Sequence, residues 1–140
     1  MDDNTELLNT GQVEVLLDWF DRYGVDYPWA GTRDPWAIWV SEVMLQQTAV
    51  SAVKSRYLRW MERYPTPGHL AETGEDEYLR DWEGLGYYNR ARNLASAAGE
   101  IVLRFGGRVP RSYDDLRSLP GIGDYIASAL SSFAFNERHA

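Results

Sequence analysis

The sequence has no cysteine among its 140 residues. That absence excludes disulfide bonds, cysteine-ligated zinc and a cysteine-bound iron–sulfur cluster held by this chain. No apolar run approaches the roughly 18 residues that a membrane-spanning helix needs. The acidic first residues also differ from a secretory signal or a transit peptide. We therefore expect a cytoplasmic protein with no membrane segment and no metal bound by these residues.

Positive charge is also scarce, because 14 Lys and Arg face 21 Asp and Glu, for a net charge of −7. This balance argues against a protein that coats nucleic acid non-specifically, since such binding rests on cationic contacts with phosphate. The charge is uneven, however: acidic residues dominate 1–15 and 72–83, and arginines dominate 84–117. A locally basic stretch can bind phosphate even on an acidic protein.

The length and a hydrophobic content of 44% fit one globular domain. We expect an acidic tail over 1–12 and a single domain over 13–140. Residues 13–20 carry an apolar stripe at helical spacing, which predicts an amphipathic helix ending near Gly24. Because no stretch alternates with a period of two, no strand is expected.

The spacing of apolar residues predicts helices along the rest of the chain. Asp34 is placed to cap a helix that has Pro35 in its first turn and runs to Leu45. Thr48 is placed to cap the next helix, which Pro65 ends. Further helices are expected at about 67–73, 75–83, 87–105, 112–118 and 124–135. The sequence therefore predicts an all-α fold with about eight helices, several of them short.

Glu42 lies in the predicted helix 35–45, which is apolar on nearly every face and should be buried. Because burial disfavours the ionised carboxylate, we expect the pKa of Glu42 to be raised. A carboxylic acid with a raised pKa suits general-acid catalysis near neutral pH. Gln46, one helical turn further on, would share its face and fix its orientation. The alternative is a structural carboxyl satisfied by a backbone cap or an arginine.

Two glycines, Gly121 and Gly123, lie in the turn Leu119–Gly123 between two predicted helices. Glycines let the backbone approach a partner closely, and their N–H groups next to a helix start form a concave anion site. Phosphate is the natural anion for such a site. The alternative is a helix–helix turn that binds nothing.

Two aromatic residues, Tyr87 and Tyr88, follow the glycine turn at 84–86 and precede Arg90 and Arg92. Aromatic side chains beside arginines resemble a wedge that enters a duplex next to phosphate contacts. The alternative is that one tyrosine belongs to the core and the other to the surface.

Three blocks, residues 41–48 (SEVMLQQT), 84–94 (GLGYYNRARNL) and 119–123 (LPGIG), carry a family resemblance. Together they resemble the MutY-type adenine DNA glycosylases of the helix-hairpin-helix superfamily, over about residues 13–135. The pair Gln46-Gln47 favours adenine glycosylases over thymine-mismatch relatives. The resemblance implies an all-α helix-hairpin-helix glycosylase fold, with a six-helix-barrel half and an N-terminal helix.

The resemblance implies an enzyme of base excision repair. The family flips adenine out of an adenine:8-oxoguanine or adenine:guanine mispair in double-stranded DNA and hydrolyses its N-glycosidic bond. Glu42 matches the acid that protonates the adenine ring, and Tyr125 matches a tyrosine beside it. Bifunctional relatives carry a lysine nucleophile at the position of Tyr125, and a phenol cannot form a Schiff base. The resemblance therefore implies a monofunctional glycosylase.

The remaining site residues also follow from the resemblance. Gln47 and Tyr87 match residues that enter the DNA, and the hairpin 121–123 matches the phosphate-binding hairpin. Arg90 and Arg92 are expected to contact DNA. Trp29 and Gln46 are expected in the base pocket, with a core position as the alternative for Trp29, because tryptophans belong more often to the core. Ala30 stands where the family often has an arginine.

In the family, a second catalytic carboxylate, in an Asp-Gly-Asn motif, follows beyond position 140. Four cysteines for a [4Fe-4S] cluster come later. We therefore expect this chain to be an N-terminal portion, monomeric, and inactive or nearly so by itself. The apolar stripe of 13–20 should then be exposed or repacked, because its usual partner helices follow position 140. An inactive helix-hairpin-helix DNA-binding module and a purely structural bundle are the two alternatives.

Overall fold

A computed structural model describes residues 27–134 and shows an all-helical fold, as predicted, with no strand in that range. The acidic tail and the helix predicted over 13–20 lie outside the described residues. The helices are α3 (Pro35–Leu45), α4 (Val50–Arg63), α5 (Pro67–Ala71), α6 (Glu75–Trp82), α7 (Asn89–Phe105), α8 (Tyr113–Arg117), α9 (Asp124–Ala129) and the π-helical turn η1 (Leu130–Ala134). None of the described helices is long and apolar enough to cross a bilayer.

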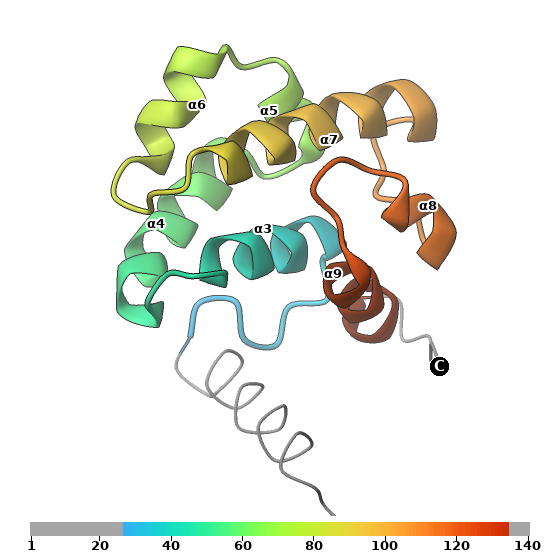
Figure 1. Cartoon of the computed structure of the whole chain (residues 1–140), viewed down its shortest axis with the longest axis horizontal. Helices are drawn as coiled ribbons and strands as arrows, with labels where there is room; N and C mark the ends of the chain where they lie inside the picture. Colours follow the sequence, from blue (N-terminus) through green and yellow to red (C-terminus); the bar gives the residue numbers. More distant parts are fainter. Residues whose placement is uncertain (1–26, 135–140) are drawn as a thin grey trace, which may run out of the picture.

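Helix α3 forms the centre of the fold, packed against α4, α7 and η1 (Figure 1). Every residue from Trp36 to Leu45 is buried, which explains why its sequence is apolar on all sides. The predicted start is confirmed, because an Asp34 carboxylate oxygen accepts a hydrogen bond from the Trp36 backbone N–H at 3.2 Å. This central helix is therefore fixed both by its cap and by contacts on all its faces.

The predicted cap of the next helix is wrong. Helix α4 begins at Val50 with Ala49 at its N-cap, and no side chain caps it. The Thr48 hydroxyl turns away from the helix and accepts a hydrogen bond from Arg90 at 2.9 Å. The inward stripe is as expected, because Val53, Tyr57 and Trp60 of α4 are buried. Burial of that stripe, rather than a capping hydroxyl, stabilises this helix.

Helix α7 starts two residues later than predicted, because Tyr87 adopts a left-handed backbone conformation with φ 48°. Its end is as predicted. Gly106 takes the left-handed conformation with φ 65°, and the N–H of Gly107 bonds to the Ile101 carbonyl at 3.0 Å. The chain then turns into α8, which Ser112 caps through the Asp115 N–H at 3.0 Å.

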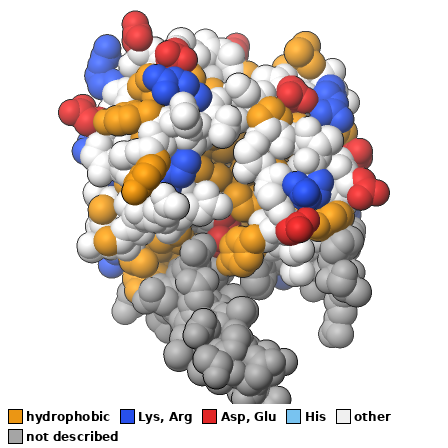
Figure 2. All heavy atoms as spheres, in the orientation of Figure 1, with side chains coloured by type: hydrophobic (Ala, Val, Ile, Leu, Met, Phe, Trp, Pro, Cys, Tyr) orange, Lys and Arg blue, Asp and Glu red, His pale blue; other side chains and the backbone are white. Residues whose placement is uncertain are grey.

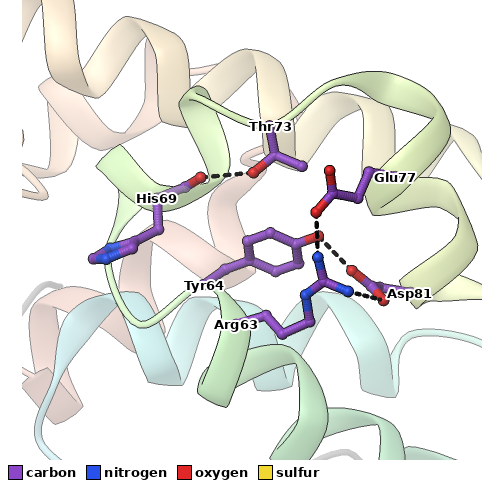
Figure 3. A network of polar contacts seen from close by, with 6 residues as sticks. All are labelled: Arg63, Tyr64, His69, Thr73, Glu77 and Asp81. Atoms are coloured by element: carbon purple, nitrogen blue, oxygen red, sulfur yellow. Dashed lines mark hydrogen bonds and ion pairs between the residues drawn. The ribbon is translucent and has the colours of Figure 1, made fainter.

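A network of charged side chains joins α4 to α6 on the surface, where Arg63 donates to Glu77 and, at 3.1 Å, to Asp81 (Figure 3). The Tyr64 hydroxyl also donates to Asp81. Burial and this hydrogen bond raise the pKa of Tyr64 above its ordinary value of 10.0. We call Arg63, Tyr64, Glu77 and Asp81 the α4–α6 network.

Candidate functional site: a groove between two turns

A groove of about 700 Å³ opens where the end of α3 meets the start of α7. Eight residues line it: Gln46, Gln47, Tyr87, Tyr88, Asn89, Arg90, Arg92 and Asn93. They come from two segments far apart in the sequence. The structure therefore brings together Gln46, Gln47, Tyr87, Arg90 and Arg92, five of the residues singled out from the sequence.

Two residues on this groove, Gln47 and Tyr87, have positive φ values of 59° and 48°. They are the only non-glycine residues in the described range with positive φ. A left-handed conformation costs a residue with a Cβ roughly 1–2 kcal/mol. Both side chains are exposed, and 62% of the Tyr87 surface is accessible. Strain of this kind, on exposed side chains at a groove, points to a functional position.

The Arg90 guanidinium is turned into the protein rather than outward. Its Nη1 donates to the carbonyls of Val43 at 2.6 Å, of Met44 at 3.2 Å and of Gln46. Its Nη2 donates to the Thr48 hydroxyl at 2.9 Å and to the carbonyls of Leu85 at 3.1 Å and Gly86 at 3.3 Å. Burial lowers the pKa of this guanidinium from its ordinary value.

These contacts give Arg90 a task that the sequence did not suggest. The last carbonyls of a helix have no partner within the helix, and Arg90 satisfies those at the end of α3. Its guanidinium also lies 5.5 Å from the Tyr87 ring centre and 5.3 Å from that of Trp82. Direct contact between Arg90 and phosphate stays a prediction, one that this inward orientation does not favour.

Arg92, by contrast, is exposed and lines the groove. Its guanidinium donates to the Asn89 side chain at 3.1 Å and lies 3.6 Å from a Glu75 carboxylate oxygen. Exposed ion pairs of this kind hold a side chain only weakly. Arg92 therefore remains accessible to an anion in the groove.

A smaller cavity of about 70 Å³ lies next to the groove, between α3, α7 and the glycine hairpin. Its lining residues are Trp39, Val43, Gln46, Arg90, Asn93, Leu94, Pro120 and Gly121. Gln46, Arg90 and Asn93 line both spaces, so the groove and the cavity adjoin. The glycine hairpin predicted to bind phosphate thus lines the cavity that adjoins the groove.

The glycine hairpin packs tightly on α7. Gly121 has φ 78°, and a Cβ added there would lie 2.9 Å from the Cβ of Asn93. Gly123 has φ −100°, and a Cβ there would meet nothing within 4 Å. Arg117 holds the hairpin from the other side, donating to the Ile122 carbonyl at 3.0 Å and pairing with Asp124.

Glu42 lies on α3 one helical turn before Gln46 and is completely buried, with an exposed fraction of 0%. Gln46 ends the helix and is half-buried on the groove. The expected burial of Glu42 is confirmed, whereas its raised pKa stays a prediction. A carboxyl at this depth is costly to ionise, so the choice between a catalytic and a structural role for Glu42 stays a prediction.

Four predicted site residues line neither the groove nor the adjoining cavity: Glu42, Trp29, Gly123 and Tyr125. Trp29 is completely buried in the core. Its ring stacks on that of Tyr27, with ring centres 5.3 Å apart, and lies edge-on to that of Tyr57, with ring centres 5.4 Å apart. It does not line the groove or the adjoining cavity, so its place in a base pocket stays a prediction. Tyr125 is half-exposed on α9, directly after the hairpin.

Asn89 and Asn93 also line the groove and were not predicted from the sequence. Both lie on α7 one turn apart, away from the stripe of buried residues that includes Ala91 and Leu94. That polar face, with Arg92 between the two asparagines, was the available signal. On the side shown in Figure 2, basic and acidic side chains are interspersed.

The chain contains no residues suited to an iron–sulfur cluster, because it has no cysteine. Within residues 27–134, no three His, Asp or Glu side chains gather in a group that could hold a metal ion.

The sequence model of the HhH-GPD superfamily base excision DNA repair proteins matches residues 40–136, which include the α3 end, the groove and the hairpin. The chain therefore belongs to this superfamily of DNA repair proteins. This confirms the helix-hairpin-helix glycosylase resemblance predicted from the sequence.

Relatives define the likeness further. The chain is 44% identical to an adenine DNA glycosylase of Rattus norvegicus over 131 residues, covering 87% of this chain and 25% of the relative. It is 45% identical to the adenine DNA glycosylase of Mycolicibacterium smegmatis, covering 86% of this chain and 41% of the relative. Among solved structures, a thermostable thymine-DNA glycosylase matches with a TM-score of 0.78 at 32% identity, covering 91% of this chain and 59% of that one. The chain thus spans a quarter to three fifths of the length of these relatives.

Proposed function

We propose that the chain is the part of a monofunctional adenine DNA glycosylase that binds double-stranded DNA and supplies the acid for base release. The observation that carries this proposal is the completely buried Glu42 on the helix that ends at the groove. A buried carboxyl favours its protonated form, which lets it donate a proton to a base extruded from the helix. Protonation makes adenine a better leaving group, and an oxocarbenium-like sugar forms.

The groove residues then divide the work of binding. Gln47 and Tyr87 enter the duplex at the mispair, Arg92 contacts phosphate, and the hairpin with Gly121 and Gly123 binds a second phosphate. Gln46 contacts the extruded base. Aromatic insertion between base steps and cationic contacts to the backbone are the usual means of opening a duplex. We further propose that the protein works as a monomer in the cytoplasm and prefers adenine paired with 8-oxoguanine.

A second candidate is a thymine-DNA glycosylase. The chain is 42% identical to such an enzyme from Aeropyrum pernix, close to its identity with the adenine enzymes, and a thymine-DNA glycosylase is also a structural match. The Gln46-Gln47 pair favours adenine. Parallel assays on duplexes with adenine:8-oxoguanine, adenine:guanine and thymine:guanine pairs separate the two candidates.

The test of Glu42 is single-turnover base release by the protein extended through the segment that its longer relatives contain. Glutamine keeps the shape of the side chain but cannot transfer the proton. Removing a general acid typically costs about 10²- to 10⁴-fold in rate, so we expect a loss in that range for Glu42→Gln. Glu62→Gln, an exposed change on α4, is the matched control and should leave the rate unchanged. Unchanged release by Glu42→Gln would exclude Glu42 as the acid.

The 140-residue chain itself should bind duplex DNA and release adenine slowly or not at all. Binding should weaken with salt, and Arg92→Ala should reduce the salt slope by about one unit. Salt-sensitive binding without base release by the extended protein would instead identify an inactive DNA-binding module. Rapid release by the 140-residue chain would contradict the proposal that further residues are required.

A further inference from the structure

Arg90 joins the two turns that carry the strained residues. One Nη atom reaches the carbonyls of Val43, Met44 and Gln46, directly before Gln47. The other reaches the carbonyls of Leu85 and Gly86, directly before Tyr87, and also the Thr48 hydroxyl. The turns are about 40 residues apart in the sequence and meet at this one guanidinium.

The residue before each strained position is therefore held by the same side chain. Gln46 and Gly86 both accept hydrogen bonds from Arg90, and the following residues, Gln47 and Tyr87, have φ values of 59° and 48°. A left-handed conformation persists at such residues only where the surroundings over-determine it. The Trp82 indole N–H reinforces the second turn by donating to the Gly86 carbonyl at 3.0 Å.

We propose that Arg90 is a positioning residue that holds Gln47 and Tyr87 in their left-handed conformations and fixes their separation across the groove. This rests on the proposed function, in which those two side chains enter the DNA. Arg90 acts through the two turns and does not itself need to touch the DNA. The guanidinium suits this task because its planar fork presents donors to two turns at once.

Lysine at this position would keep the charge and lose the fork. Its ammonium is a single point with three donors and cannot satisfy both groups of carbonyls in the same geometry. One turn would be released, and its left-handed residue would relax toward an ordinary conformation. Arg90→Lys is therefore a sharper test than a truncation, since a purely electrostatic role for Arg90 would survive it.

The first measurement needs no DNA. Backbone chemical shifts and three-bond HN–Hα couplings of the 140-residue chain report whether Gln47 and Tyr87 are left-handed. We expect both signatures in the wild-type chain and in Arg63→Lys, the same change in the α4–α6 network. We expect Arg90→Lys to lose at least one of them while the shifts of α5 and α8 stay unchanged. Retention of both signatures in Arg90→Lys would overturn the proposal.

A wild-type measurement guards against an Arg90→Lys chain that does not fold. A guanidinium held at both ends has hindered rotation, so separate Nη resonances with slowly exchanging protons should be observed for Arg90. A single averaged resonance would show a freely rotating group and overturn the proposal. The exposed Arg92 supplies the internal reference for free rotation.

The second measurement is binding of a fluorescein-labelled duplex that contains an adenine:8-oxoguanine pair, compared with a fully paired duplex. Binding must then order a freed side chain, which lowers affinity, so Arg90→Lys should bind the mispaired duplex about 2- to 12-fold more weakly. Its affinity for the paired duplex should change little, because the charge is kept. Equal losses on both duplexes would assign Arg90 to phosphate and overturn the positioning role.

Failure of the two proposals is distinguishable. Loss of the left-handed signatures in Arg90→Lys, together with no DNA binding by the wild-type chain, supports the positioning role and contradicts the proposed function. Mispair binding that is unaffected by Arg90→Lys, with both signatures retained, supports the proposed function and removes Arg90 from it.

Discussion

Two arginines, Arg63 and Arg90, each use both Nη atoms as hydrogen-bond donors, but their surroundings differ. Arg63 pairs with carboxylates of α6, and 46% of its side chain is exposed to solvent (Figure 3). Arg90 binds neutral oxygens at the buried end of α3 and at the turn before α7. Exposed ion pairs contribute little to stability, whereas buried acceptors that lose their donor are costly. The number of contacts thus says less about a side chain's importance than the solvent around its partners does.

The largest effect that this comparison predicts is on stability at Arg90. Arg90→Ala removes a donor from the carbonyls at the end of α3, a helix that is buried from Trp36 to Leu45. The Val43 carbonyl keeps the Gln46 N–H, but the single Thr48 hydroxyl proton cannot serve both the Gln46 and the Leu85 carbonyls, so the Met44 carbonyl and one of these two lose their donor. Unsatisfied buried acceptors cost about 1–3 kcal/mol each, so we expect a loss of about 2 kcal/mol or more in the free energy of unfolding. Urea denaturation followed by tryptophan fluorescence measures it. A loss under about 1 kcal/mol would show that water replaces the guanidinium and would remove the contrast with Arg63.

The hairpin offers a second test on the groove side. Gly121→Ala forces a Cβ to within 2.9 Å of Asn93 at a residue with φ 78°. Strain and overpacking of this kind cost about 1–3 kcal/mol, and the Asn93 side of the groove should shift. Gly123→Ala is the matched control, because its Cβ meets nothing within 4 Å. Thermal unfolding of both variants should show a lower midpoint for Gly121→Ala, and equal midpoints would contradict the tight packing.

A smaller effect is expected in the α4–α6 network. Arg63→Ala removes an ion pair with the exposed Glu77 and another with Asp81, whose side chain is 12% exposed and which keeps the Tyr64 hydroxyl as a donor. Together the two pairs contribute about 0.5–1 kcal/mol. The loss should shrink as salt is added, because exposed charges are screened. Denaturation at low and high salt measures both effects, and DNA binding should be unchanged. A loss as large as that of Arg90→Ala would break the comparison.

The smallest expected effect is on stability at alkaline pH, with no change in stability near neutral pH. Burial and the Asp81 hydrogen bond raise the pKa of Tyr64 above its ordinary value of 10.0. Because the pKa of Tyr64 is raised in the folded state, its protonated hydroxyl contributes its full stabilisation below pH 10. This stabilisation is lost as the pH rises through the folded-state pKa. Tyr64→Phe should therefore flatten part of the decline in stability above pH 10. Identical alkaline profiles for the two proteins would exclude Tyr64 as a source of that decline.

Local signals allowed much of the fold to be predicted from the sequence. Asp34 and Pro35 mark the start of α3, and Gly106 marks the end of α7, because caps and left-handed glycines act on their immediate neighbours. The Thr48 prediction failed because a hydroxyl at that position satisfies Arg90 instead. The π-helical turn Leu130–Ala134 was also missed, since the apolar spacing there does not separate it from an α-helix.

The candidate site was predictable only in part. The buried Glu42 and the tight glycine at 121 follow from the pattern of neighbouring residues. The role of Arg90 does not, because its partners are mostly backbone carbonyls between 44 and 47 residues away or in a nearby turn, and every residue type has a carbonyl. The left-handed conformations of Gln47 and Tyr87 are equally hidden, since neither residue type favours positive φ.

Those two conformations limit how robust the molecule is to heat. Glycine at either position would relieve the backbone and remove the side chain that borders the groove. Directed evolution for thermal stability alone should therefore replace Gln47 or Tyr87 early, and the selected variants should bind duplex DNA weakly. Measuring the duplex affinity of those variants would show how far stability and DNA binding conflict at these two residues.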